Sequence, residues 1–139
     1  SSAASDVYKR QNLLNEKNNG ENVLKLIQNN QILSSHDISN GGLIVALSEM
    51  SMASNYGVKI AKPKKLANLF KYFFGEDQGR YLLEIDTKNL ASVENYLKDN
   101  SIYCENIGFT QKNYFEIEGE MKIDIKELFK INNEWYNNY

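Results

Sequence analysis

Apolar residues recur at helical spacing in five segments of the chain. The segments are marked by Val23, Leu26 and Ile27; by Leu43, Ala46, Leu47, Met50 and Ala53; by Leu66, Leu69, Phe70 and Phe73; by Leu90, Val93 and Leu97; and by Leu128, Phe129 and Trp135. This spacing predicts helices over 19–30, from the Gly41–Gly42 pair to about Ser54, around 66–73, after a cap at Asp86 or Thr87, and at the C-terminal end.

Strand patterns occupy the intervals between these helices. Short strands are predicted over 32–38 and 58–60, and the nearly continuous apolar run 81–85 predicts a central strand covered on both faces. The segment 102–110 is strand-like, and the alternation over 114–117 and 121–125 predicts a hairpin that turns at Glu118–Gly119. Because helices and strands mix without strict alternation, the predicted fold class is α+β, a mixed β-sheet with packed helices.

Residues 1–11 interrupt the pattern, because they show no periodicity. Asp6 to Gln11 back-translate as GAT GTG TAT AAG AGA CAG, which resembles a transposase adaptor used to prepare sequencing libraries. The alternative is a genuine flexible arm. We interpret 1–11 as a non-native tail without regular structure, and 12–139 as one domain of a longer protein whose upstream part is missing.

Composition excludes several classes of protein. The 139 residues are 42% hydrophobic and 24% charged, as is ordinary for a globular domain. With 16 basic and 18 acidic residues the net charge is -2, which provides no field for nucleic acid or an anionic membrane, and no apolar run is long enough for a transmembrane helix. Single copies of Cys104 and His36 exclude an internal disulfide and Cys- or His-rich metal centres. We interpret Cys104 as a buried, inert thiol in a strand, and we expect a soluble cytoplasmic protein.

The segment Ser35–Leu43 is the first candidate for chemistry, because a strand, a polar turn and two glycines lead into a helix. Free N–H groups at a helix start attract anions, and glycine lets a phosphate approach the backbone. Ser39 and Asn40 can donate to a ligand or cap the helix, and we expect an exposed turn with positive φ at a glycine. A capped turn without a ligand and a purely structural histidine are the alternatives. The candidate residues are His36, Asp37, Ser39, Asn40, Gly41 and Gly42.

The second candidate is Phe74–Tyr81, which contains Arg80, the only arginine after residue 11. A guanidinium can fork onto a carboxylate or a phosphate. Glu76 and Asp77 can bind Mg²⁺ or pair with Arg80, so a polar loop with an internal ion pair is the alternative. We predict that Arg80 pairs with Glu76, Asp77 or Asp37 and brings both motifs to one edge of the sheet. The candidates here are Glu76, Asp77, Gln78 and Arg80.

Together these segments resemble the large subunit of phosphoribosylformylglycinamidine synthase. The residues from His36 to Met50 are similar to its H-D-x-S-D-G-G-L-x-V-A-L-x-E-M signature, and 74–80 are similar to its motif at the entry of a strand. Asn40 departs from the usual aspartate, which removes a charge but keeps a side chain that can cap. Other segments fit in the same order, namely Asn19–Gly20–Glu21 before the first helix, Ile107–Gly108, and Glu134–Trp135.

The resemblance implies the layered α/β/α fold of the C-terminal domain of aminoimidazole ribonucleotide synthetase, here in the second copy of a duplicated enzyme. It implies ATP-dependent amidation of formylglycinamide ribonucleotide, with ammonia derived from glutamine, in purine biosynthesis. In the second copy, Glu76, Asp77 and Gln78 would face an auxiliary nucleotide side instead of the working site.

ATP and Mg²⁺ would be held mainly by N-terminal domains that this chain lacks, so we expect the chain alone to bind neither and to be inactive. The implied partners are those domains, a glutaminase subunit and a small bridging subunit. Two alternatives stay open. One is a non-catalytic copy that only supports the enzyme. The other is a different superfamily member, such as a selenophosphate synthetase, a thiamine-phosphate kinase or a hydrogenase-maturation protein.

Overall fold

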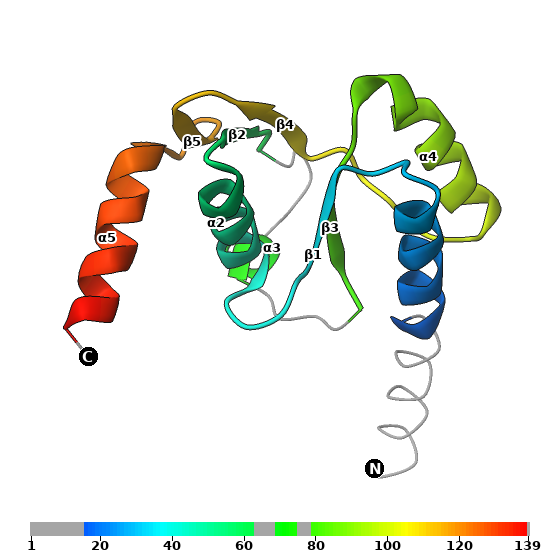
Figure 1. Ribbon diagram of the computed structural model, residues 1–139, viewed down its shortest axis with the longest axis horizontal. Coiled ribbons are helices and arrows are strands. Elements are labelled where there is room, and N and C mark those ends of the chain that lie inside the picture. The colour runs from blue at the N-terminus through cyan, green and yellow to red at the C-terminus, as the bar shows by residue number, and fades with distance from the viewer. Residues whose placement is uncertain (1–15, 63–68, 75–78, 139) are drawn as a thin grey trace, which may run out of the picture. The chain divides into compact units, whose positions relative to one another are not determined.

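The computed structural model describes residues 16–62, 69–74 and 79–138 (Figure 1). The described residues form two compact units, one from the ranges 16–40 and 79–105 and the other from 41–62, 69–74 and 106–138. The expectation that 1–11 have no regular structure lies outside the described residues. No helix in the described part of the chain is long and apolar enough to cross a membrane.

The first unit is a two-stranded antiparallel sheet that packs against two helices. Strands β1 (Ser34–Asp37) and β3 (Tyr81–Glu84) pair along their full length. The helix over 16–28 and α4 (Thr87–Asp99) lie side by side, as Figure 1 shows, and the buried side chains Leu26, Val93 and Leu97 form the core between them. Leu83 and Ile85 pack onto this core from the sheet, so one face of the sheet is covered by the helices.

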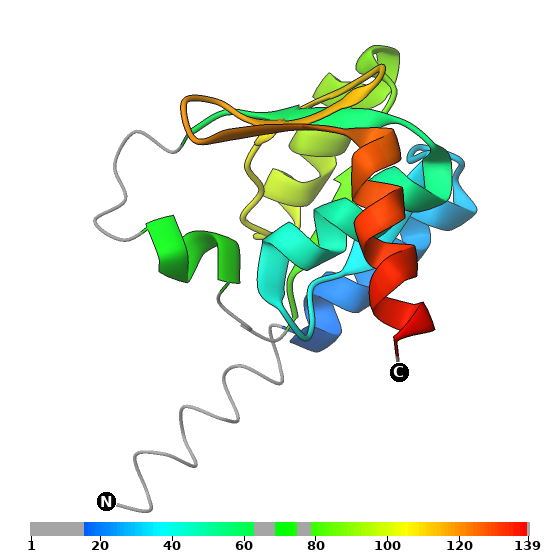
Figure 2. The ribbon, with the colours of Figure 1, turned by 90° about the vertical axis from the view of Figure 1, so that its left-hand side faces the viewer.

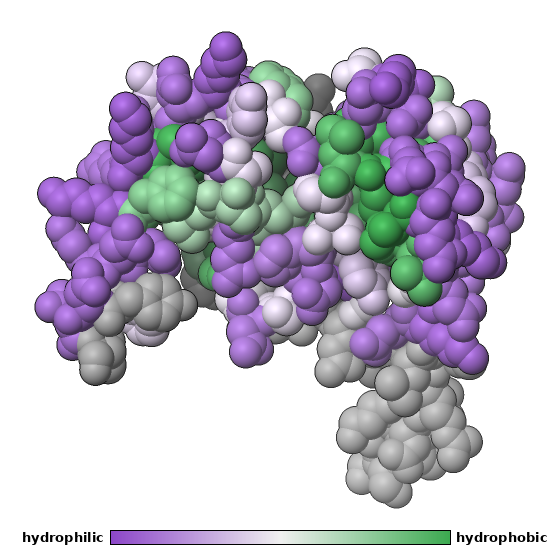
Figure 3. All heavy atoms as spheres, viewed as in Figure 1, coloured by the Kyte–Doolittle hydropathy of each residue, from purple (hydrophilic) through white to green (hydrophobic). Residues whose placement is uncertain are grey.

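Local signals set the ends of both helices in this unit. Asp86 caps α4 as predicted, because its side chain accepts a hydrogen bond from the Lys88 N–H at 3.0 Å. The helix over 16–28 ends where Asn30 adopts φ 54°. It includes Asn19–Gly20–Glu21, so the triplet lies within the helix, as the helix predicted over 19–30 has it, and not before it. Leu24 and Ile27 are exposed, and Figure 3 shows apolar side chains at the surface of this unit.

The prediction of a central strand over 81–85 is wrong for the described residues. There β3 pairs only with β1, and all four of its residues are half-buried. Leu83 faces the helices, whereas Leu82 lies in register with His36 on the opposite face. The adjacent apolar residues Leu82 and Leu83 therefore lie on opposite faces of β3, and among the described residues only the face of Leu83 is covered by the helices.

The second unit is a four-stranded mixed sheet with helices on one face. The strands are β2 (Gly57–Ile60), β4 (Gly108–Gln111), β5 (Tyr114–Ile117) and β6 (Met121–Asp124), in the order β4-β2-β5-β6. β2 and β5 are parallel and the other pairs antiparallel, which confirms the predicted mixed sheet. Figure 2 shows α2 (Gly42–Ser54) and α5 (Ile125–Asn137) on the same side of this sheet, and α3 (Leu69–Phe74) contacts α2.

The core of the second unit follows the predicted apolar stripes. The predicted hairpin is confirmed, because β5 pairs with β6 around Gly119. Phe115 and Ile117 point from β5 into the core, as their alternation predicted. The buried apolar residues of this unit are Leu43, Ala46, Leu47, Ile60, Phe73, Phe115, Ile117 and Ile125.

Two packing predictions at the C-terminal half are wrong. The strand predicted over 102–110 is limited to β4, so Cys104 lies in an irregular segment and is exposed. Trp135 was expected to pack, but 59% of it is exposed. In the described part of the chain, α5 makes extensive contacts only with α2 and β6. The side of α5 that bears Trp135 is exposed.

Candidate functional site

The pairing of β1 with β3 brings the two sequence motifs to one edge of the two-stranded sheet, as predicted. Asp37 lies opposite Tyr81, and one residue further on the Ile38 N–H donates to the Arg80 carbonyl at 2.8 Å. The exposed residues Ser39 and Asn40 follow directly. Glu76, Asp77 and Gln78 lie outside the described residues, so the ion pair of Arg80 with Glu76, Asp77 or Asp37 stays a prediction.

The backbone orients the ring of His36. Its Nδ1 lies 2.7 Å from the carbonyl oxygen of Asp37 and 3.9 Å from the Asp37 carboxylate. Since a carbonyl only accepts, Nδ1 carries a proton in this contact, and a neutral ring then presents Nε2 as an acceptor. The Asp37 carboxylate is the more distant of these two contacts and is mostly exposed. This is the kind of contact that a structural histidine makes.

The two glycines both adopt positive φ, which confirms the backbone prediction. Gly41 has φ 82° and Gly42 has φ 70°. A Cβ on Gly42 would stand 2.7 Å from the carbonyl carbon of Phe74 and 2.8 Å from the oxygen of Phe73, and one on Gly41 would overlap the side chain of Val45. The turn was expected to be exposed, but Gly42 is buried because the end of α3 lies against it. Packing within the unit is therefore enough to require both glycines.

Neither Ser39 nor Asn40 is the N-cap residue of α2, so the expectation that one of them caps this helix is not met. The N-cap position is Gly41, one residue later than either polar side chain, and its left-handed conformation sets the start of the helix. Both Ser39 and Asn40 are exposed. Their other predicted role, as donors to a ligand, stays a prediction.

Sequence reasoning missed Asn19 as a residue that builds this edge. The Asn19 Nδ2 donates to the carbonyl of Gly79 at 2.8 Å. Gly79 has φ 74°, and a Cβ there would stand 2.9 Å from the Cα of Glu16. Gly20 adjoins the hydroxyl of Tyr81, 3.1 Å from where a Cβ would be. The signal was present in the Asn19–Gly20–Glu21 triplet, whose partner only the tertiary structure reveals.

Other candidate chemistry is weak in the described part of the chain. Although Cys104 is exposed, nearby protein atoms displace some of the water around its thiol, and this desolvation and the charge of Glu94 raise the pKa of the thiol, which disfavours the reactive thiolate. No group of three or more His, Cys, Asp or Glu residues able to hold a metal occurs among the described residues.

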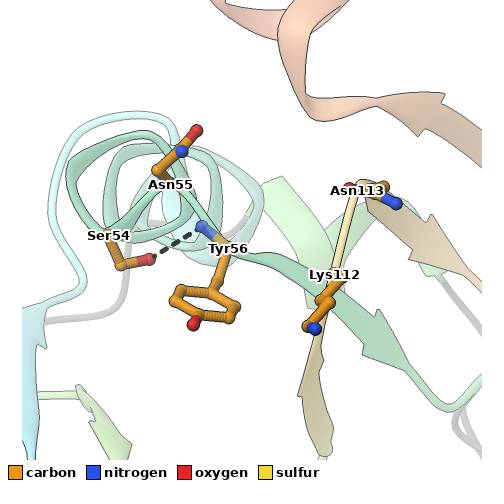
Figure 4. Close-up of a pocket in the computed structure, with 5 residues that line it drawn as sticks. All are labelled: Ser54, Asn55, Tyr56, Lys112 and Asn113. Carbon is orange, nitrogen blue, oxygen red and sulfur yellow. Dashed lines mark hydrogen bonds between the residues drawn. The ribbon is translucent and has the colours of Figure 1, made fainter.

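A pocket of about 240 Å³ lies in the second unit, and none of the candidate site residues predicted from the sequence lines it (Figure 4). In it the Tyr56 N–H donates to Ser54 Oγ at 3.4 Å. The pocket adjoins the C-terminal end of α2, where the helix dipole opposes an anion. Its lining residues are Ser54, Asn55, Tyr56, Lys112 and Asn113.

Sequence comparison finds relatives over most of the chain. It is 42% identical over 128 residues to phosphoribosylformylglycinamidine synthase subunit PurL of Pelagibacter ubique, which covers 92% of this chain and 18% of the relative. It is 36% identical over 124 residues to the subunit of the same name from Rhodopseudomonas palustris (strain BisB5), covering 89% and 17%. The chain thus spans less than a fifth of the length of these relatives.

Comparison with solved structures shows that the fold of this chain is also present in a PurL protein. Thermotoga maritima PurL complexed with FGAR superposes with a TM-score of 0.71 at 15% identity, over 81% of this chain and 20% of that one. The same protein complexed with ATP gives 0.70 at 14% identity, over 81% and 21%. The family model "AIR synthase related protein, C-terminal domain" matches residues 2–117. The chain therefore belongs to the family of AIR synthase related proteins and contains their C-terminal domain.

Proposed function

We propose that the chain is the C-terminal domain of a phosphoribosylformylglycinamidine synthase large subunit. The complete enzyme would be an ATP-dependent ligase that converts formylglycinamide ribonucleotide and glutamine-derived ammonia to formylglycinamidine ribonucleotide in purine biosynthesis. The observation that carries this proposal is the 42% identity to a subunit of that name over 92% of the chain. The fold shared with a PurL protein complexed with FGAR and with ATP supports it.

In this proposal the edge at the end of β1 and the start of β3 faces a phosphate-bearing ligand. Arg80 supplies a planar guanidinium, which matches phosphate geometry better than a lysine ammonium does. Ser39 and Asn40 follow the paired strands and supply exposed donors. The turn after β1 is formed by the motif that contains His36, Asp37, Gly41 and Gly42. The motif that contains Arg80 also includes Glu76, Asp77 and Gln78.

The reaction would need groups from outside this chain. ATP would phosphorylate the amide oxygen, ammonia would displace the phosphate, and Mg²⁺ would screen the phosphate charges. We propose that the N-terminal domains of the same polypeptide hold ATP and Mg²⁺, that a glutaminase subunit and a small bridging subunit complete the complex, and that it works in the cytoplasm.

A chimera tests this proposal. Residues 12–139 would replace the matching segment of the Pelagibacter ubique subunit, and the chimera would be expressed in a bacterium that lacks its own large subunit. We expect growth without added purines, whereas the subunit with this segment deleted should give none. A folded chimera without ammonia-dependent amidation would contradict the proposal. The isolated 139-residue chain should show neither ATP hydrolysis nor amidation.

A second candidate is a copy of the domain that only supports the enzyme. It is favoured by one observation, namely that packing inside the second unit already requires Gly41 and Gly42. Arg80→Ala and Arg80→Lys in the chimera separate the two. A binding role predicts loss of activity in both variants at unchanged melting temperature, whereas a supporting role predicts that activity falls only as far as thermal stability does.

A further inference from the structure

We propose that Asn19 is a positioning residue for Arg80, because it fixes the peptide group from which the arginine side chain departs. This inference rests on the proposed function, in which Arg80 meets a phosphate-bearing ligand. Asn19 belongs to the helix over 16–28 and precedes Gly79, whose carbonyl it binds, by 60 residues.

The peptide groups on both sides of the Arg80 Cα are held by hydrogen bonds. On the N-terminal side, the Gly79 carbonyl accepts from the Asn19 Nδ2 at 2.8 Å. On the C-terminal side, the Arg80 carbonyl accepts from the Ile38 N–H at 2.8 Å. Fixing both peptide planes fixes the direction of the Cα–Cβ bond, so only the side-chain torsions of Arg80 are left to vary.

The helix over 16–28 is shaped to receive this turn. Glu16, Asn19 and Gly20 are spaced so that they lie on one helix face. The backbone at Glu16 comes so close that Gly79 has no space for a Cβ, with 2.9 Å to the Glu16 Cα. Gly20 leaves space for the hydroxyl of Tyr81, the residue after Arg80. Gly79 and Tyr81, the residues on either side of Arg80, therefore both contact this helix.

The chemistry of the contact explains why an asparagine stands at this position. The Gly79 carbonyl needs a donor, and the amide of asparagine supplies one in a partly buried contact. An aspartate has the same shape but only acceptors, so Asn19→Asp would set a carboxylate against a carbonyl. Asn19→Ala removes the donor without adding a charge, and Asn19→Gln keeps an amide donor on a longer side chain.

The matched control is Asn18→Asp, the same substitution one residue earlier. The Oδ1 of Asn18 accepts a hydrogen bond from the Asn22 amide at 3.1 Å, and an aspartate can still accept it. The donor of Asn18 makes only a long, exposed contact of 3.4 Å to the Asn100 carbonyl. The control therefore adds the same charge to the same helix without touching the Gly79 turn.

The experiment measures two quantities in the chimera described above. In Asn19→Asp and Asn19→Ala, hydrogen exchange of residues 79–84 should accelerate by about fivefold, as the loss of one hydrogen bond allows. The KM for one phosphate-bearing substrate, formylglycinamide ribonucleotide or ATP, should rise on the order of tenfold while kcat changes little. Asn19→Gln should recover part of both effects, and Asn18→Asp should show neither.

Three results would overturn the inference. Unchanged exchange in Asn19→Ala would show that the bond does not hold the turn. Faster exchange with an unchanged KM for both substrates would show that the bond is structural only. A folded chimera that is inactive before any Asn19 substitution would refute the proposed function itself, and the positioning role with it.

Discussion

Replacing Gly42 by alanine should destabilise the protein far more than the same replacement at Gly119. Both glycines belong to the second unit and have nearly the same left-handed conformation, with φ 70° at Gly42 and φ 75° at Gly119. They differ in their surroundings. A Cβ on Gly42 would meet the backbone of Phe73 and Phe74 at 2.7–2.9 Å, whereas a Cβ on Gly119 would have no atom within 4 Å.

The magnitudes follow from this difference. The left-handed conformation costs a residue with a Cβ about 1–2 kcal/mol, and this cost applies at both positions. A Cβ on Gly42 would also clash with the backbone of Phe73 and Phe74, which cannot move away as a flexible side chain can. Such overpacking adds about 1–3 kcal/mol, and this cost applies only at Gly42. We therefore expect about 1–2 kcal/mol for Gly119→Ala and about 2–5 kcal/mol for Gly42→Ala.

The assay is urea unfolding of the 139-residue chain, followed by circular dichroism at the helix band. The difference between the two variants isolates the steric contribution, because their conformational costs cancel. If Gly42→Ala is no more destabilising than Gly119→Ala, the contact between the start of α2 and the end of α3 does not explain the second glycine. Close approach of a ligand would then be the explanation for the diglycine.

Three further predictions follow from the contacts of single side chains: two concern buried polar groups, and the third concerns a carboxylate that titrates. The Tyr96 hydroxyl donates to the Oδ1 of Asn22 at 2.7 Å, and Asn22 is only 4% exposed, so Tyr96→Phe should cost about 1–3 kcal/mol in urea unfolding. Tyr103→Phe, at a side chain 86% exposed, is the neutral control, and equal effects would contradict the role of the bond. The hydroxyl of Ser51 is buried without a hydrogen-bond partner in the described part of the chain, so Ser51→Ala should raise the melting temperature, unlike Ser48→Ala, which removes a bond to the Ile44 carbonyl. A lower melting temperature in Ser51→Ala would show that the hydroxyl has a partner. Partial burial raises the pKa of Glu116, but the hydrogen bond and charge of Lys59, with Gln111 and Lys122, outweigh it and hold the pKa below its ordinary value. This stabilisation is present above the unfolded pKa and is lost as pH falls through the lower folded pKa, so Glu116→Gln should flatten the acid side of the stability curve, and an unchanged curve would contradict this account.

Elements whose signals are local were predictable from the sequence. α4 follows from the spacing of Val93 and Leu97 and from the Asp86 cap, and the β5–β6 hairpin follows from alternation around Gly119. In each case the signal lies within the element or next to it, because periodicity and capping act over a few residues. The two motifs at the ends of β1 and β3 were also found in the sequence, since their unusual residue types stand close together.

Contacts between distant segments were decided only by the tertiary structure. Periodicity reports that one side of an element is apolar, but it does not report what covers that side. Leu82 and Leu83 are therefore adjacent in sequence yet face different surroundings, and Trp135 belongs to an apolar stripe yet is exposed. The diglycine predicted a positive φ, but only the approach of α3 explains why Gly42 is buried. The bond from Asn19 to Gly79 spans sixty residues, and no local pattern could have paired them, because the fold alone brings that helix face to that turn.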